Sequence, residues 1–186
     1  MPDLQPSSPL PVNMQRYTAP DLQLRELERV SKLRVQALRS TEACAAQADP
    51  KYLPESPNTA CGTDPFALWI APDDWLVYSL TDTVTALGDA MALVESRLPL
   101  VTTDVTSASV VLELSGPRSI DVLMRDCTLD LDGEAIRMNC CARTLFAQTT
   151  VLIHRPEAFT WRLFVERSVA RHVWDWLVDT AGEPLA

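Results

Sequence analysis

The residues in this chain that could carry out chemistry are few, and their spacing matches no complete catalytic site. The histidines are His154, beside Arg155-Pro156, and His172, in a segment where Arg171 and Asp175 can pair as i and i+4 on a helix. A general base needs a nucleophile, an orienting group or a metal within reach. Neither histidine has such a partner at a recognisable spacing, so the sequence assigns no catalytic residue.

The cysteines do not form a recognisable redox or metal motif. They are Cys44, Cys61, Cys127, Cys140 and Cys141, an odd number with no C-x-x-C spacing. Adjacent cysteines such as Cys140 and Cys141 rarely reach disulfide geometry without strain, and no His or Asp stands near them at metal-ligand spacing. We therefore expect buried thiols that pack as small apolar groups, and no metal site.

Two short polar motifs could serve either a ligand or a turn. Ser115-Gly116-Pro117 could present free N–H groups to an anion at a helix N-terminus. A phosphate loop has more glycines and usually a lysine, so a structural strand-to-helix turn is the favoured interpretation. Asp73-Asp74 could be an acid/base pair, but we expect it at a hairpin tip, where both carboxylates are solvated and serve the turn.

Hydrophobic periodicity predicts strands followed by a helix, more than once along the chain. Strands are expected at Lys32–Arg39, Phe66–Ile70, Trp75–Leu80, Val101–Val105, Ser109–Leu114, Arg143–Gln148, Thr150–His154 and Phe159–Val165. Helices are expected at Asp21–Val30, at Thr81–Arg97 with Asp82 or Thr83 as its cap, after Gly116-Pro117, and from Ser168 to Thr180, with helical turns at Thr41–Ala48 and an ordered loop at Asp49–Asp64. This pattern predicts an α+β fold made of two similar sheet-plus-helix units.

Length and charge limit the classes of function. With 186 residues, we expect a single domain over residues 21–182, preceded by a flexible tail over residues 1–20 that holds five of the fourteen prolines. The net charge of −9 and the presence of only two lysines argue against nucleic-acid binding. No apolar run approaches the roughly 20 residues that span a bilayer, and the N-terminus lacks the features of a signal peptide. We therefore expect a cytoplasmic protein with no membrane partner.

The tryptophans are the candidate residues for a subunit interface. At 100° per residue, Trp174 and Trp176 lie about 200° apart on the last helix, so they cannot share one narrow stripe. Trp176 falls roughly with Val173 and Leu177, and Trp174 falls toward the edge of that side. Either this helix is lodged between the sheet and another element, or it belongs to an interface, where tryptophan is enriched. Trp174, Trp176 and Trp69 are the interface candidates.

Four segments of the chain resemble the gamma subunit of heterotetrameric sarcosine oxidase. They are Leu53–Thr59 (LPESPNT), Ala67–Leu80, Val105–Leu131 and Phe164–Asp179, and the resemblance runs from about Lys32 to Thr180. It implies a complex of alpha, beta, gamma and delta subunits that oxidatively demethylates sarcosine to glycine with FAD, FMN and NAD. Oxygen is the acceptor, and tetrahydrofolate captures the one-carbon unit. The resemblance also implies that the gamma chain is similar to the folate-binding domain of glycine-cleavage aminomethyltransferases and holds no cofactor of its own.

The stretch that would hold folate lacks the residues for it. Aminomethyltransferases place an Asn, paired glycines and paired aspartates in the hairpin after the strand–helix block, where an acidic group holds the reacting folate nitrogen. The corresponding stretch here, Ala142–Pro156, contains no Asp, Glu, Asn or Gly. We therefore expect a non-catalytic structural subunit, with FAD, FMN, NAD and tetrahydrofolate held by its alpha, beta and delta partners. A gamma-type subunit of a related N-methyl amine demethylating oxidase, or a standalone folate-dependent aminomethyltransferase-like protein, remains the alternative.

Overall fold

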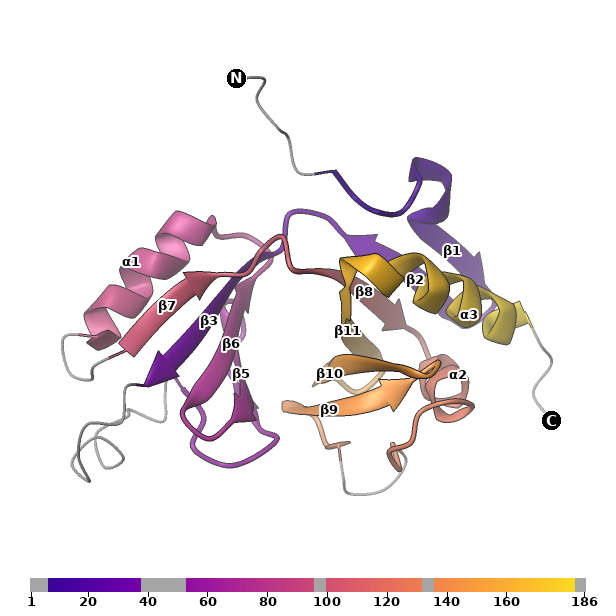
Figure 1. The fold of residues 1–186 in the computed structure, drawn as a ribbon. Coiled ribbons are helices and arrows are strands. Elements are labelled where there is room, and N and C mark those ends of the chain that lie inside the picture. The colour runs from indigo at the N-terminus through magenta and orange to yellow at the C-terminus, as the bar shows by residue number, and fades with distance from the viewer. Residues whose placement is uncertain (1–6, 38–52, 96–99, 132–135, 183–186) are drawn as a thin grey trace.

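Two antiparallel β-sheets lie face to face at the centre of the molecule (Figure 1). This computed structural model describes residues 7–37, 53–95, 100–131 and 136–182. Within them, the large sheet has six strands in the spatial order β1 (Arg16–Ala19), β2 (Leu22–Leu27), β8 (Ser109–Ser115), β11 (Thr160–Glu166), β10 (Thr149–Glu157) and β9 (Cys140–Phe146). The small sheet has five, in the order β4 (Ala60–Cys61), β5 (Phe66–Ala71), β6 (Asp74–Ser79), β3 (Ser31–Ala37) and β7 (Leu100–Asp104).

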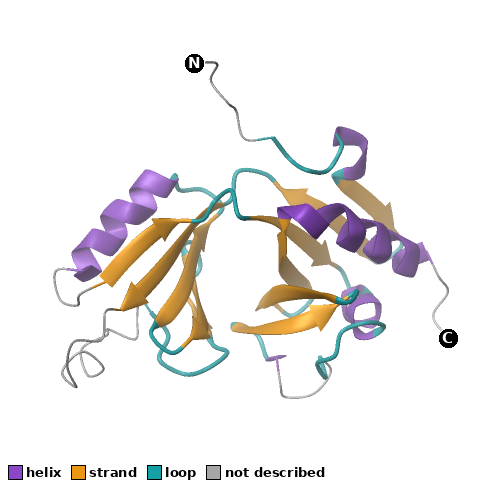
Figure 2. Ribbon diagram, in the orientation of Figure 1, coloured by secondary structure: helices purple, strands orange, loops and turns teal. Residues whose placement is uncertain are grey.

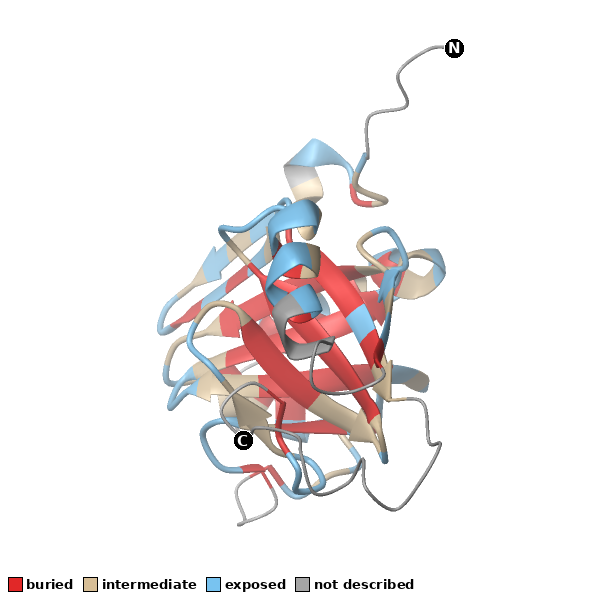
Figure 3. Cartoon of the chain, turned by 90° about the vertical axis from the view of Figure 1, so that its left-hand side faces the viewer, coloured by how far each residue is buried: buried red, intermediate tan, exposed pale blue. Residues whose placement is uncertain are grey.

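Helices cover the outer faces of both sheets and give four layers, α/β/β/α (Figure 2). The helix α1 (Val84–Glu95) packs Leu87 and Met91 on the small sheet, and Figure 3 shows buried strands behind its exposed outer turns. The large sheet carries α2 (Ser119–Met124) and α3 (Ala170–Gly182) on its other side. Single 3₁₀ turns occur at Val12–Met14 and Arg167–Val169.

The space between the sheets is filled by large apolar side chains from both of them. Strand alternation explains this, because every second residue of a strand faces the same way. The small sheet contributes Phe66, Leu68, Leu76 and Tyr78, and the large sheet contributes Val111, Cys141, Leu152 and Phe164. The two faces form one apolar core that holds the sheets together.

The two sheet-plus-helix units are nested in the sequence. Strands β2 and β8 pair with each other in the large sheet, with Leu24 opposite Leu114 and Leu27 opposite Val111. All strands of the small sheet come from the stretch of chain between them. The expectation of two similar units is confirmed, although they do not follow one another along the chain.

Several predicted elements are confirmed with small shifts at their ends. The β5–β6 hairpin turns at Pro72-Asp73, where Asp73 adopts the left-handed backbone conformation with φ of 58°. The hydroxyl of Thr83 accepts a 3.3 Å hydrogen bond from the Ala86 N–H, so Thr83 caps α1. The predicted strands of the second half correspond to β8, β9, β10 and β11.

Two predictions for the N-terminal part are wrong. The segment Asp21–Val30 contains the strand β2 in place of a helix, because it pairs with β8 and buries Leu22 and Leu24 on one face. The flexible tail predicted for residues 1–20 does not hold for Arg16–Ala19, which forms the edge strand β1 through backbone pairing with β2. Residues 1–6, the predicted turns at Thr41–Ala48 and the start of the Asp49–Asp64 loop lie outside the described residues.

Candidate functional site

The cross-strand register places a row of polar side chains inside the molecule. On neighbouring strands of the large sheet, His154 lies opposite Arg162, Arg162 opposite Glu113, and Glu113 opposite Arg25. Tyr78 reaches this row from the small sheet. We call Tyr78, Glu113, His154 and Arg162 the intersheet cluster.

Hydrogen bonds connect every member of the intersheet cluster. Arg162 donates from Nη1 to the Tyr78 hydroxyl at 2.8 Å and from Nε to Oε2 of Glu113 at 3.0 Å. The Tyr78 hydroxyl lies 2.7 Å from Nδ1 of His154. Arg25 donates to the other Glu113 oxygen from Nη2 at 2.6 Å and from Nε at 2.9 Å. The Glu113 carboxylate is therefore balanced by two guanidinium groups.

Burial sets the protonation states of the cluster. Burial, together with the Arg162 charge, lowers the pKa of His154 to about 3, and burial raises the pKa of Tyr78 above its ordinary value. Because Arg162 donates to the Tyr78 oxygen, the hydroxyl proton can point at Nδ1 of His154. The proton of the neutral imidazole then sits on Nε2, which is buried and has no hydrogen-bond partner among the described residues.

The geometry favours a structural role for the intersheet cluster over a catalytic one. The side chains of Tyr78 and His154 have no exposed surface, so a substrate does not reach them. With these pKa values, neither group exchanges a proton near neutral pH. Sequence reasoning missed Glu113 and Arg162, although the signal is present. Glu113 is the one charged residue of β8, and Arg162 lies among apolar residues of β11, whose other charged residue, Glu166, stands at the strand's end.

The hairpin that corresponds to the folate site has an apolar interior. Strands β9 and β10 join through Ala147-Gln148, which adopt φ of 48° and 58°. The side chains of Phe146, Val151 and Ile153 are at most 1% exposed and pack into the apolar core between the large sheet and its helices. No carboxylate from this hairpin reaches that core, so its residues do not fit a folate that requires one.

The backbone N–H groups at the Ser115–Pro117 turn form hydrogen bonds within the chain. The N–H groups of Gly116 and Arg118 donate to the carbonyls of Phe159 and Asp21 at 2.9 and 3.2 Å. Gly116 has φ of +111°, and a Cβ there would lie 2.3 Å from the Asp21 carbonyl oxygen. The glycine is required by this close approach of two chain segments, and the structural interpretation of the motif is supported over the phosphate-binding one.

The adjacent cysteines have different surroundings. The Cys141 thiol is fully buried and donates to the carbonyl of Trp69 at 3.2 Å, while Cys140 is half-buried. Burial raises the pKa of Cys141 to about 12, so the thiolate is not formed near neutral pH. Cys141 packs as an apolar group. Among the described residues, no group of three or more His, Cys, Asp or Glu is placed to hold a metal ion.

The expectation that both aspartates of the β5–β6 hairpin are solvated is wrong for one of them. Asp73 sits in the turn as predicted, but Asp74 is 7% exposed and forms an ion pair with Arg34. Asp74 lies at the start of β6 and faces the neighbouring strand β3, which carries Arg34. The two adjacent carboxylates therefore point to different environments and form no acid/base pair.

The last helix orients its tryptophans differently from the sequence prediction. Trp174 is 3% exposed and belongs to the apolar core between α3 and the large sheet, while Trp176 is 41% exposed. Trp174 is therefore corrected from an interface candidate to a core residue. Trp176 packs beside His172, whose Nε2 lies 2.9 Å from the Ala147 carbonyl oxygen. Trp69 is half-buried against the core of the small sheet.

Two further expectations concern the helices. The ion pair predicted between Arg171 and Asp175 on α3 is present at 3.5 Å and is exposed. Among the described residues, no helix has the length and apolar character needed to cross a membrane.

Comparison with known sequences finds one family over most of the chain. A family model described as "Sarcosine oxidase, gamma subunit family" matches residues 40–183. The sarcosine oxidase subunit gamma of Corynebacterium sp. (strain P-1) is 30% identical, over 92% of this chain and 88% of the relative. That of Corynebacterium sp. (strain U-96) is 28% identical, over 86% of this chain and 79% of the relative.

Comparison with solved structures finds the same relationship in three dimensions. A chain of heterotetrameric sarcosine oxidase from Corynebacterium sp. U-96, in complex with pyrrole 2-carboxylate, superposes with a TM-score of 0.80 at 25% identity, covering 97% of this chain and 98% of that one. Aminomethyltransferase T of the glycine cleavage system from Bartonella henselae superposes with a TM-score of 0.57 at 13% identity, over 83% of this chain and 45% of that one. The second likeness extends to the fold alone.

Proposed function

This chain belongs to the sarcosine oxidase gamma subunit family, and from that membership we propose that it is the non-catalytic, structural gamma subunit of a heterotetrameric sarcosine oxidase. The assembled enzyme oxidatively demethylates sarcosine to glycine, and the one-carbon unit passes to tetrahydrofolate. The observation that carries this proposal is the match to a chain of a heterotetrameric sarcosine oxidase over nearly the full length of both chains.

The interior of the chain supports a role without catalysis. Its buried histidine and tyrosine are locked in neutral forms, and its β9–β10 hairpin offers apolar side chains where a folate site needs a carboxylate. FAD, FMN, NAD and tetrahydrofolate are therefore assigned to the alpha, beta and delta partners. The proposed location of the complex is the cytoplasm.

The two remaining tryptophan candidates, Trp176 and Trp69, are the residues that we propose for the contact with partner subunits. On α3, Trp176 is 41% exposed, whereas Trp174 is 3% exposed. Tryptophan is enriched among the residues that dominate binding at protein interfaces. We assign Trp176 to the contact with a partner subunit, with the half-buried Trp69 as a second contact residue.

Co-expression of the four subunits tests the proposal. Cells that express alpha, beta and delta without this chain should yield less assembled complex, less bound flavin and lower sarcosine turnover than cells that express all four. Expressing this chain from a second plasmid should restore the assembled complex, the bound flavin and the turnover. If omission changes neither assembly nor flavin content nor turnover, the structural role is refuted.

The purified complex and the isolated chain also distinguish sarcosine oxidation from related activities. A purified complex should oxidise sarcosine faster than dimethylglycine and other N-methyl amines, since the family name points to sarcosine. The isolated chain should bind no tetrahydrofolate in calorimetry, because the stretch Ala142–Pro156 of the β9–β10 hairpin has no carboxylate for the folate nitrogen. Tight folate binding by the isolated chain would favour a transferase.

A further inference from the structure

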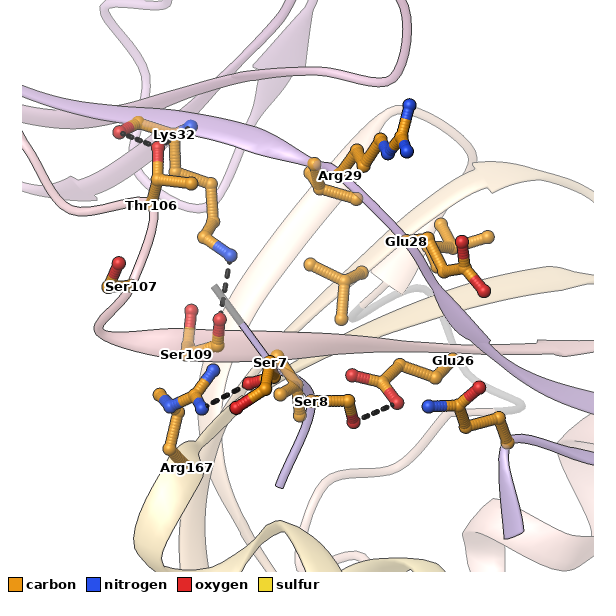
Figure 4. A pocket seen from close by; sticks show the side chains of 15 residues that line it. Ser7, Ser8, Glu26, Glu28, Arg29, Lys32, Thr106, Ser107, Ser109 and Arg167 are labelled. Atoms are coloured by element: carbon orange, nitrogen blue, oxygen red, sulfur yellow. Dashed lines mark hydrogen bonds between the residues drawn. The ribbon is translucent and has the colours of Figure 1, made fainter. Parts of the chain in front are cut away.

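A pocket of about 310 Å³ lies where two chain connections pass between the sheets. The β2–β3 connection and the β7–β8 connection cross side by side there, and residues just after β11 close one side (Figure 1). Figure 4 shows the Lys32 amine directed to Ser109, with Arg167 on the same side of the pocket. We call this the Lys32 pocket.

Lys32 is an unusual residue to find at such a place. Its side chain is 3% exposed, and its Nζ donates one hydrogen bond, 2.7 Å long, to the Ser109 carbonyl. An ammonium has three N–H donors, so two remain for another acceptor. Among the described residues, no carboxylate lies within ion-pair distance of Lys32 or Arg167, and Arg167 donates to the Ser7 carbonyl at 2.5 Å.

The side chains that line the pocket carry three positive charges, on Arg29, Lys32 and Arg167, and two negative charges, on Glu26 and Glu28. Burial lowers the pKa of Lys32 to about 8, and the Arg167 charge adds to the effect, while Asp104 and Glu26 oppose it. Glu26 already accepts a 2.5 Å hydrogen bond from the Ser8 hydroxyl. Glu28 and Arg29 also line the pocket but are exposed at its rim.

We propose that the Lys32 pocket binds a small organic carboxylate, held by the Lys32 ammonium and the Arg167 guanidinium. A carboxylate accepts hydrogen bonds from both groups and removes the repulsion between them. A monoanion is favoured over a phosphate dianion, because Glu26 and Glu28 line the same pocket. The volume suits a small molecule, and Val30, Val110 and Val111 give it an apolar wall.

The presence of only two lysines, Lys32 and Lys51, allows a direct test on the full chain. Lysine labelled with ¹³C at Cε gives two NMR signals, and the variant Lys51→Arg assigns them. A carboxylate that binds the ammonium form raises the pKa of Lys32, by about 1 when acetate is at ten times its dissociation constant. The expected result is a Lys32 signal that titrates higher with acetate and is shifted less by equal ionic strengths of chloride or phosphate.

Variants locate the site. Lys32→Met keeps the apolar stem and should weaken acetate binding, followed by shifts of backbone amide signals, at least about tenfold, as should Arg167→Gln. Arg171→Met removes the same charge from an exposed site on α3 and should leave binding unchanged. Acetate binding that survives Lys32→Met, a Lys32 signal that does not respond to acetate, or an equal response to chloride would each overturn the proposal.

Discussion

Replacing each tryptophan of α3 separately distinguishes a core residue from a contact residue. Trp174 is 3% exposed in the apolar core. A buried tryptophan removes roughly 200 Å² of surface from water, which at about 25 cal/mol per Å² corresponds to about 5 kcal/mol. Truncation of buried tryptophan destabilises proteins by about 3 to 5 kcal/mol, so we expect this loss in the free energy of unfolding for Trp174→Ala. For a chain of this length, the melting temperature should fall by about 6 to 20 °C.

Trp176→Ala is the matched variant and should behave in the opposite way. Its ring is 41% exposed, so truncation opens no closed cavity and should lower the free energy of unfolding by about 1 to 2 kcal/mol. A tryptophan at an interface contributes about 2 kcal/mol or more to binding, which weakens association about 30-fold. We therefore expect a folded chain that co-purifies poorly with the other subunits.

Thermal melts of the isolated chain and co-purification with the partner subunits measure the two effects independently. The reasoning is refuted if Trp174→Ala melts within 2 °C of the parent (set against the roughly 6 °C minimum expected) and also fails to assemble, because Trp174 would then act at the interface. It is equally refuted if Trp176→Ala assembles normally.

Three further predictions follow from single contacts. Gly116→Ala should destabilise the chain by about 2 kcal/mol or more, since its Cβ would lie 2.3 Å from the Asp21 oxygen. The control Gly88→Ala, within α1 and clear of neighbours, should stabilise the chain by about 0.5 to 1 kcal/mol. Melting temperatures that shift in the same direction in both variants would contradict this. Glu113→Gln should lower the free energy of unfolding, measured in urea, by about 3 to 5 kcal/mol, because it leaves the Arg162 charge buried without its carboxylate. Arg25→Gln, which removes the half-exposed partner of Glu113, should lower it by less than about 1 kcal/mol. The pKa of His154 is about 3 in the folded chain and near 6.5 when unfolded, so stability is fully present above pH 6.5 and declines as the pH falls toward 3. The loss between pH 7 and pH 5 should be about 2 kcal/mol smaller in His154→Gln, and identical losses in both proteins would exclude this residue as the cause.

The hairpins and strand–turn–helix units could be predicted from the sequence because their signals are local. The Pro72-Asp73 turn, the Thr83 cap and the Gly116-Pro117 turn each lie within a few residues of the elements they connect or begin. The segment Asp21–Val30 is different, because its leucines fit both a strand and a helix. Pairing of β2 with β8, about 85 residues further along the chain, decides in favour of the strand.

The orientation of α3 shows a limit of reasoning from one helix alone. Trp174 and Trp176 lie symmetrically on either side of the Val173 and Leu177 stripe, so that stripe does not choose between them. The choice falls to the small residues Ala170 and Ala181, which lie within about 40° of Trp174 and let the helix approach the sheet on that side. The intersheet cluster could not be predicted either, since its members come from strands far apart in the sequence.

The nesting of the small sheet within the large one has a consequence for synthesis on the ribosome. Strand β2 emerges early, but its partner β8 emerges only after the whole small sheet has been made. At about 5 to 20 residues per second, this delay is roughly 4 to 16 s, which is long compared with the folding of a small domain. During that time the small sheet can fold first and bring the two ends of its segment together. When β8 emerges, it then lies close to β2 and can pair with its free edge.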